Sequence, residues 1–170
     1  MSKDQPYIFV LWGDHFREAE AAIFVTVLRE TSLRVKVVGL TPHQPSGANG
    51  LALVPDLSLD QVLPLAAQAT GVIIPATLPG LKRLQNDPRI SEFLRQADLH
   101  QARFVLGAMD QAEVAALEWF PFTCERVSFY PPCEDLVVFV QRLATRLTKV
   151  DNKLSPSKTI MNIPSTIVKS

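Results

Sequence analysis

The chain has few cysteines and no long apolar or basic run, and these absences exclude several classes of protein. Its 170 residues include only two cysteines, Cys124 and Cys133, too few for a disulfide scaffold. No apolar run approaches the roughly 20 residues needed to cross a bilayer. Lysine plus arginine and aspartate plus glutamate both total 17, with no basic stripe to hold nucleic acid. Because residues 1–6 also lack the build of a signal peptide, we expect a cytoplasmic protein without membrane or nucleic-acid partners.

The chain does contain an alternation of apolar strand-like runs and helical patterns, which is typical of a parallel sheet covered by helices on both faces. The expected strands lie at residues 7–12, 34–40, 51–55, 71–75, 102–106 and 126–129. The expected helices lie at residues 16–30, 58–69, 81–97, 110–119 and 134–148. We therefore predict an α/β fold with three layers, formed by one domain over residues 1–150. Residues 151–170 change to a polar composition and are predicted to be a C-terminal extension.

Local signals mark several helix boundaries. Ser58 can cap the helix that follows it, and Pro64 fits the first turn of that helix or breaks it. Asp110 and Glu113 have the spacing of a capping box, in which each side chain accepts a hydrogen bond from the backbone of the other residue. The Asp-Pro pair at residues 87–88 is a point where the helix predicted around it can be interrupted.

Three segments together resemble the ThiJ/PfpI superfamily, which includes the Parkinson-associated protein deglycase and related hydrolases and chaperones. They are residues 55–60 (PDLSLD), the strand at 71–75 (GVIIP) and the segment 103–109 (RFVLGAM), and the resemblance covers roughly residues 6–149. It implies a flavodoxin-like fold of the class I glutamine amidotransferase type, commonly a homodimer. It also implies a pocket at the carboxyl ends of the strands, where open parallel sheets bind ligands.

The active site of that superfamily combines a cysteine at a strained turn between strand and helix, a glutamate from the first helix and often a histidine. The resemblance places Glu20 at the glutamate position and Gly107 at the cysteine position. Glycine suits a strained turn because it has no Cβ atom, but it carries no thiolate. Ala76 and Thr77 stand in place of the Gly-Gly loop that supplies oxyanion-hole amides, and Tyr130 stands in place of the histidine. These five residues form the predicted ligand-binding pocket, with Glu20 and Tyr130 supplying its polar contacts.

Helical geometry singles out Glu20 independently of the resemblance. Phe16, Glu20, Ile23 and Val27 fall on one stripe of the predicted helix. Glu18 points about 200° away from Glu20 at the usual 100° per residue. A carboxylate in an apolar stripe needs a partner, and perturbed carboxylates concentrate at functional sites. Two interpretations remain open, a pocket carboxylate or a glutamate at the solvent edge of the helix start.

The positions of the three histidines and of the glycines at residues 47–50 indicate no metal or cofactor site. His15 ends the first strand region and would face the ligand crevice, as either an incidental loop residue or a binding residue. His43 and His100 lie in expected loops, and no spacing of histidine and cysteine matches a zinc site. The glycines at residues 47–50 do not link a strand to a helix as a phosphate-binding loop does. We therefore expect no cofactor.

Three functions are compatible with this sequence. The first is a non-catalytic superfamily member, a small-molecule-binding or protein-interaction module that forms a homodimer. The second is an enzyme: a deglycase or hydrolase with a relocated thiol, Cys124 or Cys133, or a chemistry carried out by Glu20 alone. Cys133 opens the last predicted helix, whose dipole lowers a thiol pKa, but a free cysteine is more commonly a small buried apolar residue. The third is a structural subunit of an oligomer.

Overall fold

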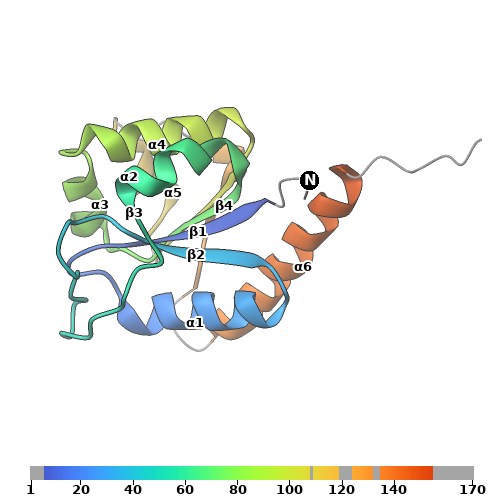
Figure 1. Ribbon diagram of the computed structural model, residues 1–170, viewed down its shortest axis with the longest axis horizontal. Coiled ribbons are helices and arrows are strands. Elements are labelled where there is room, and N and C mark those ends of the chain that lie inside the picture. The colour runs from blue at the N-terminus through green and yellow to red at the C-terminus, as the bar shows by residue number, and fades with distance from the viewer. Residues whose placement is uncertain (1–5, 108, 119–123, 132–134, 155–170) are drawn as a thin grey trace, which may run out of the picture.

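The computed structural model describes residues 6–107, 109–118, 124–131 and 135–154, which form a parallel sheet between two layers of helices (Figure 1). The strands are β1 (Tyr7–Trp12), β2 (Arg34–Gly39), β3 (Leu57–Ser58), β4 (Ala69–Ile74), β5 (Arg103–Leu106) and β6 (Val127–Phe129). Their order in the sheet is β3-β2-β1-β4-β5-β6, and every neighbouring pair is parallel. Without the two-residue β3, this is the flavodoxin-like order 2-1-3-4-5, which confirms the predicted fold class.

The helices divide between the two faces of the sheet. The α-helices are α1 (Glu18–Glu30), α2 (Leu59–Val62), α3 (Leu78–Leu84), α4 (Pro88–Leu99), α5 (Gln111–Ala115) and α6 (Leu136–Leu154), with 3₁₀ turns η1 (Leu63–Gln68) and η2 (Cys124–Arg126). In Figure 1, α1 and α6 lie on one side of the sheet, and the group from α2 to α5 lies on the other. Within the described part of the chain, no helix is long and apolar enough to span a bilayer.

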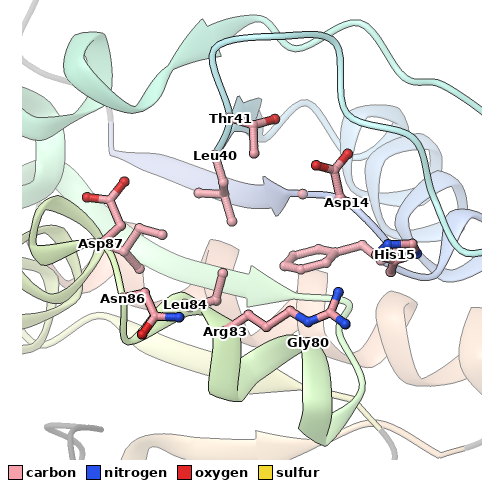
Figure 2. Close-up of a pocket in the computed structure, with 12 residues that line it drawn as sticks. Asp14, His15, Leu40, Thr41, Gly80, Arg83, Leu84, Asn86 and Asp87 are labelled. Atoms are coloured by element: carbon pink, nitrogen blue, oxygen red, sulfur yellow. The ribbon is translucent and has the colours of Figure 1, made fainter.

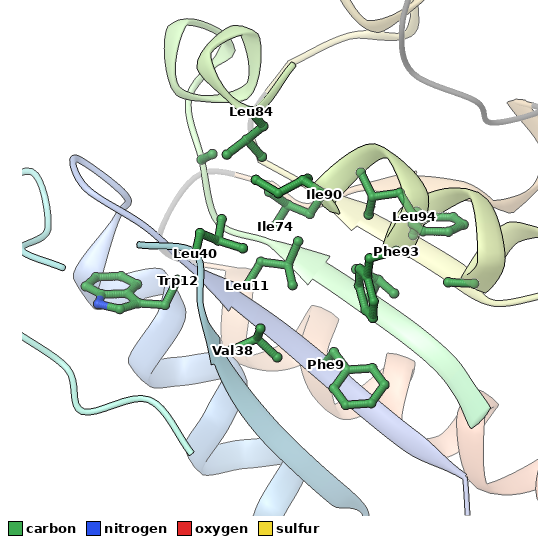
Figure 3. Close-up of a cluster of buried hydrophobic side chains, with 14 of the residues drawn as sticks. Phe9, Leu11, Trp12, Val38, Leu40, Ile74, Leu84, Ile90, Phe93 and Leu94 are labelled. Carbon is green, nitrogen blue, oxygen red and sulfur yellow. The ribbon is translucent and has the colours of Figure 1, made fainter. Parts of the chain in front are cut away.

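Strand alternation divides the apolar side chains between two cores. Phe9 and Leu11 of β1 point into the core beneath α3 and α4, where Phe93 packs edge-on against Phe9 (Figure 3). Ile8 and Val10 point into the opposite core beneath α1 and α6. Because both faces are covered, the central strands are apolar at almost every position, as the sequence predicted.

The predicted helix signals are confirmed. Ser58 caps α2 in a capping box, in which its hydroxyl accepts the Gln61 N–H and the Gln61 side chain accepts the Ser58 N–H. Asp110 and Glu113 form a second capping box at α5. The helix expected over residues 81–97 is two helices, because the Asp87 carboxylate caps the new N-terminus at Pro88.

Several predicted boundaries differ from those of the structure, and for two of them the structure shows the cause. Residues 51–55 are not a strand; the sole pairing there is an isolated bridge between Ser46 and Ala52, and the strand beside β2 begins at Leu57. Asp56 explains the shift: its N–H donates to the Val37 carbonyl at 2.8 Å, and its carboxylate accepts the Val37 N–H at 2.7 Å. The Asp56 side chain thereby replaces a backbone carbonyl as the acceptor for one N–H of β2. The first helix begins at Glu18 rather than residue 16, because residues 13–16 form a turn.

Candidate functional site

Four of the five predicted pocket residues lie together at the carboxyl ends of the strands. Ala76 follows β4, Gly107 follows β5 and Tyr130 follows β6, while Glu20 reaches the same place from the first turn of α1. Parallel strands end at the same edge of the sheet, so the topology brings these distant segments together. We call this cluster, Glu20, Ala76, Gly107 and Tyr130, the Gly107 corner.

Space, rather than backbone strain, requires glycine at position 107. A Cβ atom there would lie 2.5 Å from the Ala76 carbonyl oxygen and 3.1 Å from the Tyr130 hydroxyl oxygen. The backbone φ angle of Gly107 lies outside the left-handed region, so the strained turn expected from the sequence is not the reason for this glycine. The Ala76 carbonyl is backbone and cannot rotate away. The corner therefore has no room for a side chain at position 107.

Tyr130 fills the space next to Gly107. Its side chain is 1% exposed, and its ring packs edge-on against Phe24 at 5.2 Å between centroids. Its hydroxyl donates to the Glu20 carboxylate at 3.1 Å, and its backbone N–H donates to the Leu106 carbonyl. The phenol therefore lies beside both Glu20 and Gly107.

Glu20 is a buried carboxylate with two partners. It is 3% exposed, which rules out the interpretation of a glutamate at the solvent edge. One oxygen accepts the Tyr130 hydroxyl, and the other pairs with the Arg17 guanidinium at 2.5 Å. Arg17 is itself anchored, because its backbone N–H donates to the Pro75 carbonyl at 2.9 Å. Both oxygens of Glu20 are thus occupied within the protein.

The buried face of α1 differs in part from the predicted stripe. Phe24 and Leu28 are fully buried, whereas Ile23 and Val27 are half-buried. Phe16 is buried but precedes the helix.

Glu18, which the sequence analysis set aside, is also buried. Its carboxylate accepts the Asn49 backbone N–H at 2.5 Å, the Asn49 side-chain amide at 2.9 Å and the Leu51 N–H at 3.3 Å. Burial raises the pKa of Glu18, but these bonds and its own backbone N–H together hold the pKa below the usual value. A Cβ atom at Gly47 would overlap the Glu18 side chain, so that glycine permits the close approach. Helical periodicity could not reveal this role, because the partners lie on a distant loop.

The other predicted site residues lie apart from the corner or outside the described side chains. Thr77 is exposed, and its hydroxyl caps α3 by accepting the Gly80 N–H. The side chains of Cys124 and Cys133 lie outside the described residues, so the relocated-thiol hypothesis stays a prediction. In the described part of the chain, no group of three or more His, Cys, Asp or Glu residues could hold a metal ion.

A pocket of about 380 Å³ opens at the carboxyl ends of β1 and β2, against α3 and the start of α4 (Figure 2). We call it the Arg83 pocket. It is lined by Gly13, Asp14, His15, Phe16, Leu40, Thr41, Gly80, Arg83, Leu84, Asn86, Asp87 and Ile90. His15 lies in it, as expected for a residue after the first strand. Nothing in the sequence indicated that the other lining residues form a pocket, because only the fold brings β1, β2 and α3 together.

Several solved structures share this fold. A cysteine-to-alanine variant of a DJ-1 superfamily protein from Salmonella typhimurium matches with a TM-score of 0.72 at 18% identity, covering 85% of this chain and 91% of that one. DJ-1beta from Drosophila melanogaster has a TM-score of 0.67 at 15% identity, with 88% and 97% covered. Oxidized DJ-1 from Toxoplasma gondii has a TM-score of 0.64 at 12% identity, with 85% and 97% covered.

A comparison with curated protein sequences gave no match. The sequence model of the DJ-1/PfpI family, in contrast, matches residues 7–159. That match includes all the described strands and helices, the Gly107 corner and the Arg83 pocket. The chain therefore belongs to the DJ-1/PfpI family.

Proposed function

We propose that this chain is a non-catalytic DJ-1/PfpI protein that acts by binding, chiefly as a small-molecule-binding module. The observation that carries the proposal is the closure of the Gly107 corner. The Ala76 carbonyl and the Tyr130 hydroxyl occupy the space into which a side chain at position 107 would project. A glycine cannot act as a nucleophile, and its two neighbours leave no room for a substrate atom at that point.

The chemistry of the corner supports the same conclusion. Nucleophilic catalysis needs a group whose pKa or base partner activates it, in reach of the substrate. Glu20 is 3% exposed and already holds Arg17 and Tyr130, so it lacks the free, accessible oxygen that a general base needs. Its contacts instead tie α1 to the segment after β6. In the superfamily this corner is catalytic, whereas in this chain it connects elements of the fold.

The open Arg83 pocket favours binding of a small molecule over a purely structural role. Its volume of about 380 Å³ lies within the range of small-molecule sites, and it combines apolar and polar lining residues. It also lies at the carboxyl ends of the strands, where doubly wound sheets bind ligands. The expected homodimer and cytoplasmic location remain predictions.

An activity assay tests the non-catalytic proposal. The purified chain is incubated with methylglyoxal, and loss of substrate is followed beside an active deglycase of the family. We expect no turnover above the protein-free blank, because the corner holds neither thiol nor accessible base.

Three variants identify the residue responsible for any turnover that does appear. Activity lost in Cys124→Ala or Cys133→Ala would support an enzyme with a relocated thiol and overturn the proposal. Activity that survives both changes but is lost in Glu20→Gln would overturn it in favour of chemistry by Glu20 alone. Activity that survives all three changes would also overturn it. Circular dichroism of each variant checks that the fold is retained.

A further inference from the structure

The Arg83 pocket shares no lining residue with the Gly107 corner, although Ala76 of the corner packs in the same core as the pocket floor and lies close to Gly80. Phe16, Leu40 and Ile90, which line the pocket, belong to the core beneath α3 and α4. Tyr130 belongs to the opposite core, beneath α1 and α6. A ligand in the pocket therefore need not touch the corner.

The two carboxylates of the pocket are already engaged within the protein. One oxygen of Asp14 accepts the Ser46 N–H at 3.1 Å, and the other lies 3.2 Å from His43 Nε2. Asp87 accepts bonds from the Arg89 backbone and guanidinium, the shortest at 2.7 Å. The Arg89 interactions hold the pKa of Asp87 below its usual value, which keeps this carboxylate ionised and paired. Neither group is a free acceptor for a cationic ligand.

The donors of the pocket, in contrast, are free. Among the described residues, the side chains of Arg83, His15 and Asn86 make no hydrogen bond or ion pair. Figure 2 shows Arg83 extending along the α3 side of the pocket toward the turn that carries His15. The guanidinium has five N–H donors in a planar fork, and it stays charged at physiological pH.

The turn that holds His15 is an unusual backbone arrangement. His15 has a φ angle of 64°, in the left-handed region that residues other than glycine seldom adopt. Its N–H donates to the Ser46 carbonyl at 2.9 Å, and the Phe16 N–H donates to the Gly13 carbonyl. The turn thus fixes the backbone of His15 at the pocket rim, and residues held in such conformations cluster at ligand sites.

The floor of the pocket is apolar. Phe16, Leu40, Leu84 and Ile90 are each at most 7% exposed and contribute side chains from four different segments. A Cβ atom at Gly13 would lie 3.2 Å from the Phe16 ring and 3.4 Å from Leu40, so the glycine keeps this floor open. The site therefore offers a compact apolar surface beside one free cation.

We propose that the Arg83 pocket binds a small monocarboxylate with a compact apolar body. Arg83 holds the carboxylate through paired N–H donors, and the apolar body rests on Phe16, Leu40 and Ile90. His15 and Asn86 donate to polar groups at the rim. This assignment rests on the proposed binding function and adds to it the place and chemical class of the ligand.

The geometry favours a carboxylate over a phosphate. Phosphate sites usually offer several backbone N–H groups at a helix start or a nest. Here the N–H groups of His15 and Phe16 are used inside the turn, and Asp87 caps the start of α4. One guanidinium fork matches one carboxylate.

Isothermal titration calorimetry of the full chain tests the assignment with benzoate as the probe. Benzamide, which has the same shape without the charge, benzylamine and inorganic phosphate are titrated at the same ionic strength. We expect saturable benzoate binding with a dissociation constant on the order of 1 mM, given so few ligand atoms. Benzamide, benzylamine and phosphate should each bind at least about tenfold more weakly.

Arg83→Gln should raise the benzoate dissociation constant at least about tenfold, with Arg83→Lys in between. Lys82→Gln is the matched control, because it removes the same charge from the residue that precedes Arg83 in α3 and does not line the pocket. Lys82→Gln should leave the benzoate dissociation constant within about twofold of wild type, since an exposed charge outside the pocket acts weakly through solvent.

The proposal is overturned if benzoate fails to bind, if benzamide, benzylamine or phosphate binds as well, or if Arg83→Gln and Lys82→Gln behave alike. A thermal melt confirms that each variant is folded, so a loss of binding is not a loss of structure. A failure of benzoate to bind would not change the expectation that methylglyoxal is not turned over. Turnover of methylglyoxal would overturn the non-catalytic proposal, whatever the result of the calorimetry.

Discussion

The Gly107 corner and the Arg83 pocket lie at the same edge of one sheet, yet one is closed and the other is open. At the corner, the polar groups of Glu20 and Tyr130 bond to each other and are almost fully buried. At the pocket, Arg83 and His15 are exposed, and no described residue bonds to their side chains. Burial with satisfied partners is what stability requires, whereas free donors above an apolar floor are what binding requires.

This contrast predicts that substitutions in the two regions act on different properties. Substitutions at the corner should lower the free energy of unfolding and leave ligand binding intact wherever the protein still folds. Substitutions at the pocket should weaken ligand binding and leave the free energy of unfolding nearly unchanged. Three measurements test the comparison, and a fourth tests the buried Glu18, which lies outside both regions.

The largest effect is expected from truncating the buried phenol. Tyr130→Ala removes a ring packed against Phe24 and leaves Glu20 without one of its partners. We expect a loss of about 3–5 kcal/mol in the free energy of unfolding, measured by urea denaturation. Tyr130→Phe keeps the ring and should lose only about 1.5 kcal/mol, the value of a hydrogen bond to a charged group. Equal losses in the two variants would show that the ring packing contributes little.

Adding one methyl group at the corner should also destabilise the fold. Gly107→Ala places a Cβ atom 2.5 Å from the Ala76 carbonyl oxygen, so the backbone must shift at a cost of about 1–3 kcal/mol. Gly71→Ala is the matched control, because the nearest atoms to its Cβ would be side-chain carbons of Ile8 and Leu147, at 3.6–3.8 Å. Urea denaturation should find that control unchanged or slightly stabilised. If both alanines are tolerated, the corner is not closed by close packing.

A smaller, pH-dependent effect is expected from Glu18. Its pKa is lowered in the folded protein, so its stabilisation is present above the unfolded value of about 4.3 and is lost as the pH falls through the folded value. Glu18→Gln should lower the free energy of unfolding by about 1 kcal/mol at pH 7. The difference from wild type should shrink in acid. Glu30→Gln, which removes the same charge from the exposed end of α1, is the control. A difference that is constant with pH would contradict the role of the ionised carboxylate.

The smallest effect on stability is expected at the pocket. Arg83→Gln changes an exposed side chain without partners among the described residues, so the free energy of unfolding should change by less than about 0.5 kcal/mol. A larger loss in urea denaturation would mean that Arg83 supports the fold, and the contrast between the two regions would fail.

The sequence allowed the fold and part of the site to be predicted. Continuous apolar runs identified the central strands, the cap residues at 58 and 110 identified helix starts, and the Asp-Pro pair at 87–88 marked a helix interruption, because these signals are local. The short strand β3 was misplaced because the Asp56 side chain takes a place in the ladder, which no apolar pattern encodes. Of the five predicted pocket residues, Thr77 instead caps α3, and the other four form a closed cluster.

The sequence by itself determined that this chain folds as a doubly wound α/β domain and that a glycine follows its fifth strand. Those properties follow from residue type and spacing along the chain. Only the tertiary structure decided that Tyr130 and the Ala76 carbonyl fill the space at Gly107, and that Arg83 faces a pocket and has no partner among the described residues. Such outcomes depend on which distant side chains meet when strands of a parallel sheet end side by side, and spacing along the chain does not specify those distances.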